Sequence, residues 1–230
     1  MILLAIDCSA GLCAACVYDT EAGRELGRAV RDLGKGHAEH LIAVIEEALG
    51  SAGKAYGDLG AVGVSVGPGS FTGIRVAVSA ARGFSVALGI PAIGVDTLEA
   101  LAAEVRDRLG AKTVLAGLAS GSGEAAPAVQ AALYDDFGQE LYAPAIVTLG
   151  DAADLARKKR AVLAGTAAGR VAALAGGGLT IASEAATADI GVYARVAAAK
   201  GTAGGRPSPL YLREPDAKPQ AGFVLPRREE

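Results

Sequence analysis

The sequence predicts an α/β protein built from two lobes of the same kind, and two observations carry this prediction. Short apolar runs typical of buried strands alternate with longer segments whose apolar residues recur at helical spacing. The order of three strands, helix, strand, helix, strand, helix occurs twice, and the two occurrences meet near Gly110. This is the element order of the actin-like, ribonuclease-H-like lobe. We therefore expect two such lobes, the second reduced, in residues 1–110 and 111–205, with residues 206–230 as a surface tail.

The first lobe is predicted from local signals. A turn at residues 7–11 separates two apolar runs, and residues 19–23 form a hairpin turn. Asp96 or Thr97 caps the last helix of the lobe, and Gly110 stops it. The expected strands are residues 2–6, 12–18, 24–31, 61–66 and 90–94, and the expected helices are residues 37–49, 72–88 and 97–109.

The second lobe is predicted in the same order but from weaker signals. A turn at residues 135–138 separates two strand-like segments, and alanine-rich helices follow. The expected strands are residues 113–118, 124–134, 140–147, 161–164 and 179–182, and the expected helices are residues 151–158, 166–175 and 187–200.

Composition and charge exclude several classes of protein. The chain has 230 residues, a net charge of −3 and 51% hydrophobic residues, so it suits a sizeable core rather than disorder or autonomous tight binding of nucleic acid. The apolar start stops at Asp7, too early for a signal peptide, and no uncharged apolar run reaches about 18 residues, so we expect no membrane segment. Cys8, Cys13 and Cys16 lack the fourth ligand of an iron–sulfur site and are too few for a disulfide scaffold, which indicates the cytoplasm.

The most unusual segment is a glycine-rich turn that follows one expected strand and opens the next helix. Backbone N–H groups at such a position attract anions, but the turn is neither a Walker A loop nor a dinucleotide-binding loop. The alternative is a tight turn in which Ser70 or Thr72 caps the helix, with an exposed Phe71 facing a partner. The residues of the turn are Gly67, Pro68, Gly69, Ser70, Phe71, Thr72 and Gly73.

Two expected helices are more apolar than a single buried stripe requires. In residues 37–49 only a narrow polar face remains, and residues 72–88 carry Arg75 and Arg82 as their only charges. Burial within the fold explains this about as well, but two neighbouring helices of this kind favour an interface with another chain. The residues predicted to form or brace that interface are His37, His40, Leu41, Val44, Ile45, Phe71, Ile74, Arg75, Val78 and Arg82.

Three further motifs have weaker functional interpretations. Residues 63–67 match the G-x-S-x-G of serine hydrolases, but Ser65 lies inside an expected strand and both histidines precede it. His37 and His40 could hold a metal ion, but the sequence offers no third ligand. A basic run complements the dipole at a helix C-terminus, and contact with an RNA backbone is its minority interpretation. This run is Arg157, Lys158, Lys159 and Arg160.

Several stretches of the sequence resemble the TsaB (YeaZ) family. They are residues 6–9, which include Asp7 and Ser9, residues 67–75 with the string G-P-G-S-F-T-G-x-R, and residues 94–102. The sequence P-L-Y-L-R at residues 209–213 is similar to that family's C-terminal motif. The resemblance extends over nearly the whole chain, and the G-P-G-S-F-T-G-x-R string is long and specific.

The resemblance implies a non-catalytic scaffold subunit in the synthesis of N6-threonylcarbamoyladenosine next to the tRNA anticodon. Such a subunit pairs through helices of its first lobe with a TsaD-like transferase, and a TsaE-like ATPase joins the assembly. Asp7 and Ser9 would then be a vestigial nucleotide loop. The resemblance also implies that ATP, Mg²⁺ and a metal ion belong to partner subunits, that tRNA is reached through the complex, and that the chain can homodimerise when alone.

Two departures from the family pattern bear on catalysis. A stretch like Asp-Ala-Arg-x-Gly-Glu usually opens the second lobe, but residues 119–122 have lost the acid and the base. His37-x-x-His40 does not match the H-x-x-x-H metal motif of the catalytic paralogue. We therefore expect no catalytic and no metal-binding residue in this chain. The alternatives are an ATP-dependent phosphotransferase of the sugar-kinase class that uses Asp7, and a glycoprotease-like peptidase.

Overall fold

The computed structural model describes residues 1–110, 112–120, 128–201 and 205–212. Every expected strand and helix is present in these ranges, although several ends differ by a few residues and residues 124–127 of one expected strand lie outside them. A short 3-10 helix, Tyr56–Asp58, was not expected. The first half contains β1 (Ile2–Asp7), β2 (Leu12–Asp19), β3 (Arg24–Asp32), α1 (His37–Ala52), β4 (Leu59–Gly67), α2 (Phe71–Leu88), β5 (Ala92–Asp96) and α3 (Thr97–Leu109). The second half contains β6 (Val114–Ser120), β7 (Ala128–Tyr134), β8 (Glu140–Thr148), α4 (Leu149–Lys159), β9 (Val162–Ala164), α5 (Ala168–Leu174), β10 (Ile181–Ser183) and α6 (Ile190–Lys200).

Each half of the chain forms a five-stranded mixed sheet, and the two sheets have the same strand order. The first sheet runs β3-β2-β1-β4-β5 and the second runs β8-β7-β6-β9-β10. In both, three antiparallel strands are joined to two parallel ones. The predicted repeat of the actin-like lobe is therefore confirmed. Because β9 and β10 have only three residues each, the second lobe is reduced, as expected.

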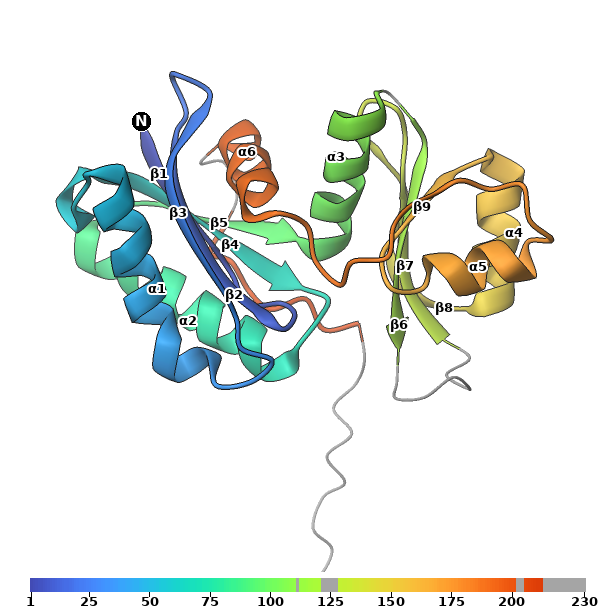
Figure 1. The fold of residues 1–230 in the computed structure, drawn as a ribbon, viewed down its shortest axis with the longest axis horizontal. Coiled ribbons are helices and arrows are strands. Elements are labelled where there is room, and N and C mark those ends of the chain that lie inside the picture. Colours follow the sequence, from blue (N-terminus) through green and yellow to red (C-terminus); the bar gives the residue numbers. More distant parts are fainter. Residues whose placement is uncertain (111, 121–127, 202–204, 213–230) are drawn as a thin grey trace, which may run out of the picture.

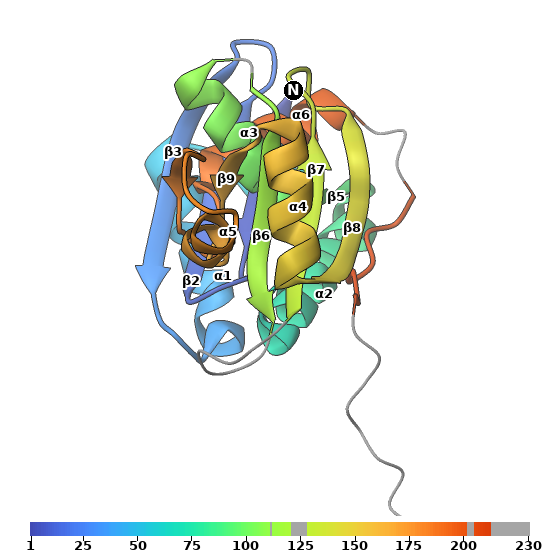
Figure 2. The ribbon, with the colours of Figure 1, turned by 90° about the vertical axis from the view of Figure 1, so that its right-hand side faces the viewer.

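The two sheets and their helices form five layers (Figure 1). Helices α1 and α2 cover the outer face of the first sheet, and α4 and α5 cover the outer face of the second. Helices α3 and α6 lie between the sheets, and Figure 2 shows the second lobe in front, with α4 across its outer face. Successive side chains of β1 point to opposite faces, so Leu3 joins the central core and Leu4 joins the core under α1 and α2.

The central helices are exchanged between the lobes, which corrects a simple division of the chain at Gly110. Helix α6 follows the strands of the second sheet but packs mainly on β1 and β2 of the first. Helix α3 follows the first sheet but makes its most extensive strand contact with β6 of the second. Each lobe therefore takes one helix from the other half of the chain.

Polar side chains cap the first turns of α2 and α3. Helix α2 begins after Ser70, whose hydroxyl accepts a hydrogen bond from the Gly73 amide at 3.3 Å. The hydroxyl cap predicted for this helix is therefore confirmed for Ser70. Helix α3 begins after Asp96, whose Oδ1 accepts a hydrogen bond from the Leu98 amide at 2.6 Å.

Asp96 gives a testable pH dependence. Burial raises the pKa of its carboxyl to about 7, against the stabilising hydrogen bonds from the helix amides. The folded chain therefore keeps this proton between about pH 4 and pH 7, where the unfolded chain has lost it, so the contribution of Asp96 to stability falls as pH rises. We expect Asp96→Asn, which retains an acceptor for the cap, to gain stability relative to wild type across this interval, by an amount on the order of a few kcal/mol at pH 7. Urea unfolding of both proteins from pH 4 to pH 8 measures this difference, and a difference independent of pH contradicts it.

Helix α2 also bears on the expectation of no membrane segment. Among the described residues it is one helix that is long and apolar enough to cross a membrane, by length and composition only. Its buried residues, which include Ala77 and Val78, pack in the core of the first lobe. A helix that covers a sheet can meet the same criteria of length and composition, and in this structure α2 packs on the first sheet.

The described part of the C-terminal tail, residues 205–212, lies along β4 and α2. The Leu210 amide donates to the Val66 carbonyl at 2.7 Å, and Arg82 Nε donates to the Pro207 carbonyl at 2.8 Å. Gly94 has no side chain, and a Cβ there would approach Pro207 at 3.4 Å. These contacts hold the described tail residues against the first lobe.

Candidate functional site

A cavity of about 440 Å³ opens between the lobes, where the hairpin end after β1 faces the end of β6. Among the described residues its walls are neutral: hydroxyl, amide, methyl and backbone groups line it, and none of these lining residues is acidic or basic. A site for ATP and Mg²⁺ needs carboxylate or phosphate oxygens around the metal and usually a cation for the phosphates. The lining residues are Ser9, Ala10, Gly11, Gly69, Ser70, Leu118, Ala119, Ser120, Gln130, Thr166 and Ala186.

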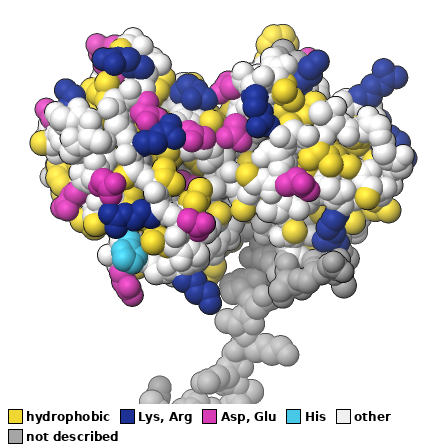
Figure 3. All heavy atoms as spheres, in the orientation of Figure 1, with side chains coloured by type: hydrophobic (Ala, Val, Ile, Leu, Met, Phe, Trp, Pro, Cys, Tyr) yellow, Lys and Arg dark blue, Asp and Glu magenta, His cyan; other side chains and the backbone are white. Residues whose placement is uncertain are grey.

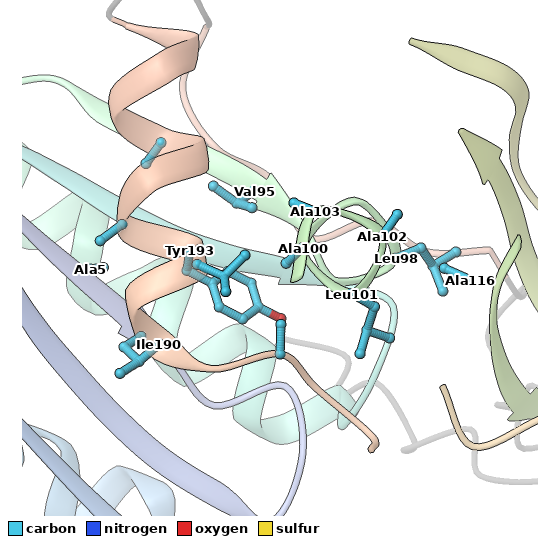
Figure 4. Packing of buried hydrophobic residues seen from close by; sticks show 14 of the residues in the cluster. Ala5, Val95, Leu98, Ala100, Leu101, Ala102, Ala103, Ala116, Ile190 and Tyr193 are labelled. Atoms are coloured by element: carbon cyan, nitrogen blue, oxygen red, sulfur yellow. The ribbon is translucent and has the colours of Figure 1, made fainter. Parts of the chain in front are cut away.

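The carboxyl group of Asp7, the acid expected in this cleft, is buried and accepts hydrogen bonds from other residues of the chain. Asp7 is 1% exposed, and its Oδ1 accepts the Ser9 amide at 2.8 Å. Its Oδ2 accepts the Thr187 hydroxyl at 2.8 Å, and Thr187 Oγ1 also lies 2.8 Å from the Tyr193 hydroxyl. Figure 4 shows Tyr193 of α6 packed with Ala100 and Leu101 of α3. The loop at Asp7 and Ser9, predicted to be a vestigial nucleotide loop, is thus hydrogen-bonded to Thr187, in the segment before α6.

The glycine-rich turn after β4 fits tightly against the hairpin end. The Ser70 amide donates to the Ser9 carbonyl at 2.6 Å. A Cβ on Gly73 would lie 2.0 Å from the Cys8 carbonyl oxygen, so only glycine lets α2 start this close to β1. The turn therefore positions α2 and forms one wall of the cavity, through Gly69 and Ser70.

Most of the residues predicted to form or brace an interface are buried within the first lobe. Helices α1 and α2 do lie side by side on the outside of the first lobe (Figure 1), but their most apolar stripes face the sheet. These side chains fill the lobe's own core, because both helices must cover an apolar sheet face. They can support a surface but cannot touch a partner directly. The residues buried in this way are His37, Leu41, Val44, Ile45, Ile74 and Val78.

A different set of side chains is exposed on α2, spaced so that they share the face opposite the core. Phe71 is 55% exposed and Val86 is 75% exposed, and between them the face carries small residues and two exposed arginines, Arg75 and Arg82, of which Arg82 donates to the Pro207 carbonyl. Gly83 has open space where a Cβ would be. We call this set the α2 face: Phe71, Arg75, Ser79, Gly83 and Val86.

The tail fixes one end of the α2 face. Arg75 Nε donates to the Tyr211 hydroxyl at 2.7 Å, and the Arg75 guanidinium lies 3.7 Å from the centre of the Phe71 ring. The Phe71 and Tyr211 ring centres are 5.8 Å apart. Of the predicted interface residues, Phe71 and Arg75 therefore lie on the exposed surface, Arg82 is exposed but bonded to Pro207, and His40 is half-buried.

The remaining motifs find structural roles. Ser65 is fully buried in β4 without a hydrogen-bond partner, and His37 Nε2 lies 3.2 Å from the Leu12 carbonyl oxygen. Within the described ranges, no three His, Cys, Asp or Glu side chains are grouped as a metal site would require. Arg157 of the basic run pairs with Asp154 at 3.0 Å, and Arg160 ends α4 in a left-handed conformation. On the face in Figure 3, acidic and basic side chains are interspersed.

Comparisons with known proteins agree with this architecture. A family model described as "tRNA N6-adenosine threonylcarbamoyltransferase", TsaD, matches residues 31–174. The chain is 30% identical to the TsaB protein of Escherichia coli over 125 residues, 54% of this chain and 52% of that protein. An uncharacterised protein of Mycobacterium tuberculosis is 32% identical over 206 residues, 85% of this chain and 84% of that one. A crystal structure described as an uncharacterised Pseudomonas aeruginosa protein similar to "peptidase YEAZ" has 26% identity and a TM-score of 0.73, with 92% and 99% of the two chains covered.

The chain belongs to the TsaB (YeaZ) family. Its alignments with the named TsaB relatives cover about half of their length. In this TsaB-family chain, the stretch that departs from the family pattern is described only at Ala119 and Ser120, and Gly121 to Glu124 lie outside the described residues. Ala119 and Ser120 line the cavity, so the lost acid and base leave a neutral wall there.

Sequence reasoning did not find Thr187, Tyr193 or Tyr211 as parts of these sites. Thr187 lies 180 residues after Asp7 and itself contacts Tyr193, and no local pattern signals the contact with Asp7. The P-L-Y-L-R motif did indicate that Tyr211 matters, but its contact with Arg75 follows only from the path of the tail.

Proposed function

We propose that this protein is the non-catalytic subunit of a complex that makes N6-threonylcarbamoyladenosine in tRNA, and that it binds and activates a TsaD-like transferase. Family membership supports the pathway, and the neutral cavity supports the non-catalytic role. An enzyme that transfers phosphoryl or carbamoyl groups needs charged or metal groups to stabilise the developing charge. Asp7, which precedes the lining residue Ser9, is not itself part of the described cavity wall and already accepts two hydrogen bonds within the chain.

The α2 face is the surface we assign to the transferase. Its small residues, Ser79 and Gly83, permit another helix to approach closely, and Phe71 and Val86 supply apolar anchors at its ends. Arg75, held over Phe71, offers a positive group at the rim. ATP, Mg²⁺ and a metal ion then belong to the transferase and to a TsaE-like ATPase, and tRNA is reached in the cytoplasm through the assembly. A homodimer through the same face competes with this pairing when the partner is absent.

Two substitutions on the α2 face test the pairing without disturbing the fold. Gly83→Glu adds a charged side chain into open space, and Val86→Glu replaces a side chain that is 75% exposed. Both should leave the thermal midpoint close to wild type, because neither removes a core contact. We expect each to weaken the complex with the TsaD-like partner at least tenfold, since a buried unpaired carboxylate costs more than about 1.4 kcal/mol.

Light scattering after size-exclusion chromatography, followed by titration calorimetry, measures mass and affinity. The matched control is Leu174→Glu, which alters a 52% exposed apolar side chain on α5 of the other lobe and should bind normally. A wild-type complex that tolerates both α2 substitutions places the interface elsewhere. The absence of any complex with wild type contradicts the proposed function itself.

A further inference from the structure

Two cysteines face each other across the hairpin that closes the first sheet at the cavity. The β1–β2 register pairs Asp7 with Ala14, so the next residues toward the turn, Cys8 and Cys13, are opposite one another. Their sulfur atoms are 3.8 Å apart, and both side chains are fully buried. All three cysteines of the chain are free thiols.

The third cysteine cannot compete for either member of this pair. Cys13 and Cys16 are an odd number of residues apart on β2, so they point to opposite faces of the sheet. Cys8 and Cys13 lie in the core under α1 and α2, whereas Cys16 lies in the central core. The sheet itself separates Cys16 from the pair.

We propose that Cys8 and Cys13 are an oxidation site, which a peroxide converts to an intramolecular disulfide. A disulfide needs the sulfur atoms at about 2.05 Å, so each must move by roughly 1 Å, within the reach of small side-chain rotations. Residues Ala10 to Leu12 between the two cysteines are partly exposed, so local opening of the hairpin end admits a small oxidant to both thiols.

The reaction balances with one peroxide for each pair of thiols. The Cys13 thiolate attacks a peroxide oxygen, the S–O bond forms as the O–O bond breaks, and hydroxide leaves with a proton as water. The Cys8 sulfur then attacks the Cys13 sulfur, and the departing hydroxyl group takes the Cys8 thiol proton and leaves as a second water. Two thiols lose two electrons, and the peroxide gains them. The hydrogen bond from the Cys8 thiol lowers the pKa of Cys13, which favours Cys13 as the first nucleophile.

This bond would lie beneath the hairpin end that lines the cavity, and against the first turn of α2. The Cys8 carbonyl oxygen contacts Gly73, and the Ser9 carbonyl accepts the Ser70 amide. Ser9, Ala10 and Gly11, which the new ring would enclose, all line the cavity. The oxidation therefore acts on the same short segment that joins the sheet, the glycine-rich turn and the cleft.

The test uses the full-length protein, folded and fully reduced, treated with hydrogen peroxide. Remaining thiols are blocked with one alkylating reagent under denaturing conditions, and the protein is then reduced and labelled with a second reagent. No Lys or Arg precedes Arg24, so one tryptic peptide holds all three cysteines, and fragment spectra assign each label. We expect the second label on Cys8 and Cys13, the first on Cys16, and a loss of two hydrogen atoms from the intact mass.

The Cys16→Ala variant should form the same bond, and the Cys13→Ala variant should form no intramolecular disulfide. Because the wild-type labels alone assign the bond, the result does not depend on the folding of either variant. The proposal is overturned by three cysteines that keep the first label, by a bond that includes Cys16, or by sulfinic acid on Cys13 without a disulfide.

Discussion

Gly73→Ala is expected to destabilise the protein by about 3 kcal/mol or more, although it adds a single methyl group to a helix. The added Cβ would lie 2.0 Å from the Cys8 carbonyl oxygen, which is backbone and cannot rotate away. Either α2 or the hairpin end must move, and the hydrogen bond between the Ser70 amide and the Ser9 carbonyl is strained with it. For a chain of this length the thermal midpoint should fall by roughly 6–12 °C.

The same substitution ten residues later on the same helix provides the control. Gly83 is exposed, and a Cβ there meets no other atom within 4 Å. Gly83→Ala should therefore raise stability by up to about 1 kcal/mol, because alanine is the better helix former. Scanning calorimetry of the two variants should show a lower thermal midpoint for Gly73→Ala and a higher one for Gly83→Ala. Equal effects would show that helix propensity, rather than the contact between Gly73 and Cys8, decides the outcome.

Tyr193→Ala is expected to cost about 3–5 kcal/mol, since it empties a fully buried site in the core between the lobes. The ring lies among side chains of α3 and α6 (Figure 4), so its loss affects both sheets at once. Tyr193→Phe keeps the ring and removes only the hydroxyl that contacts Thr187. That variant should lose about 1 kcal/mol, because Thr187 keeps its hydrogen bond to Asp7.

Chemical denaturation of both Tyr193 variants separates packing from hydrogen bonding. The midpoint should fall far more in Tyr193→Ala than in Tyr193→Phe, with the transition still cooperative in the latter. Similar losses in the two variants would mean that the hydroxyl network, rather than the filled volume, holds the lobes together.

The sequence predicted the elements of this fold well, because strand and helix periodicities are local. The turn at residues 19–23, the cap at Asp96 and the stop at Gly110 were all readable from neighbouring residues. The exchange of α3 and α6 was not predicted, since element order alone does not say which sheet a helix covers. It depends on contacts such as that of Tyr193 with the central core.

The surface site was harder to predict for a physical reason. Periodicity shows that Leu41, Val44 and Val78 are buried, but it cannot distinguish burial by the chain's own sheet from burial by a partner. The residues that α2 leaves exposed include small or polar ones such as Ser79 and Gly83, which carry no apolar signal. A candidate docking face on a helix can be identified only when the structure shows which of its other faces pack on the sheet.

The exchange of helices has a consequence for how this chain matures during synthesis. Helix α6, Ile190–Lys200, covers the inner face of β1 and β2, which leave the ribosome long before it. That face, with Leu3, Ala5 and Cys16, stays uncovered by α6 until the strands of the second sheet have also been made. The N-terminal half should therefore wait in a partly folded state, and fragments that end near Gly110 should aggregate rather than form an independent lobe.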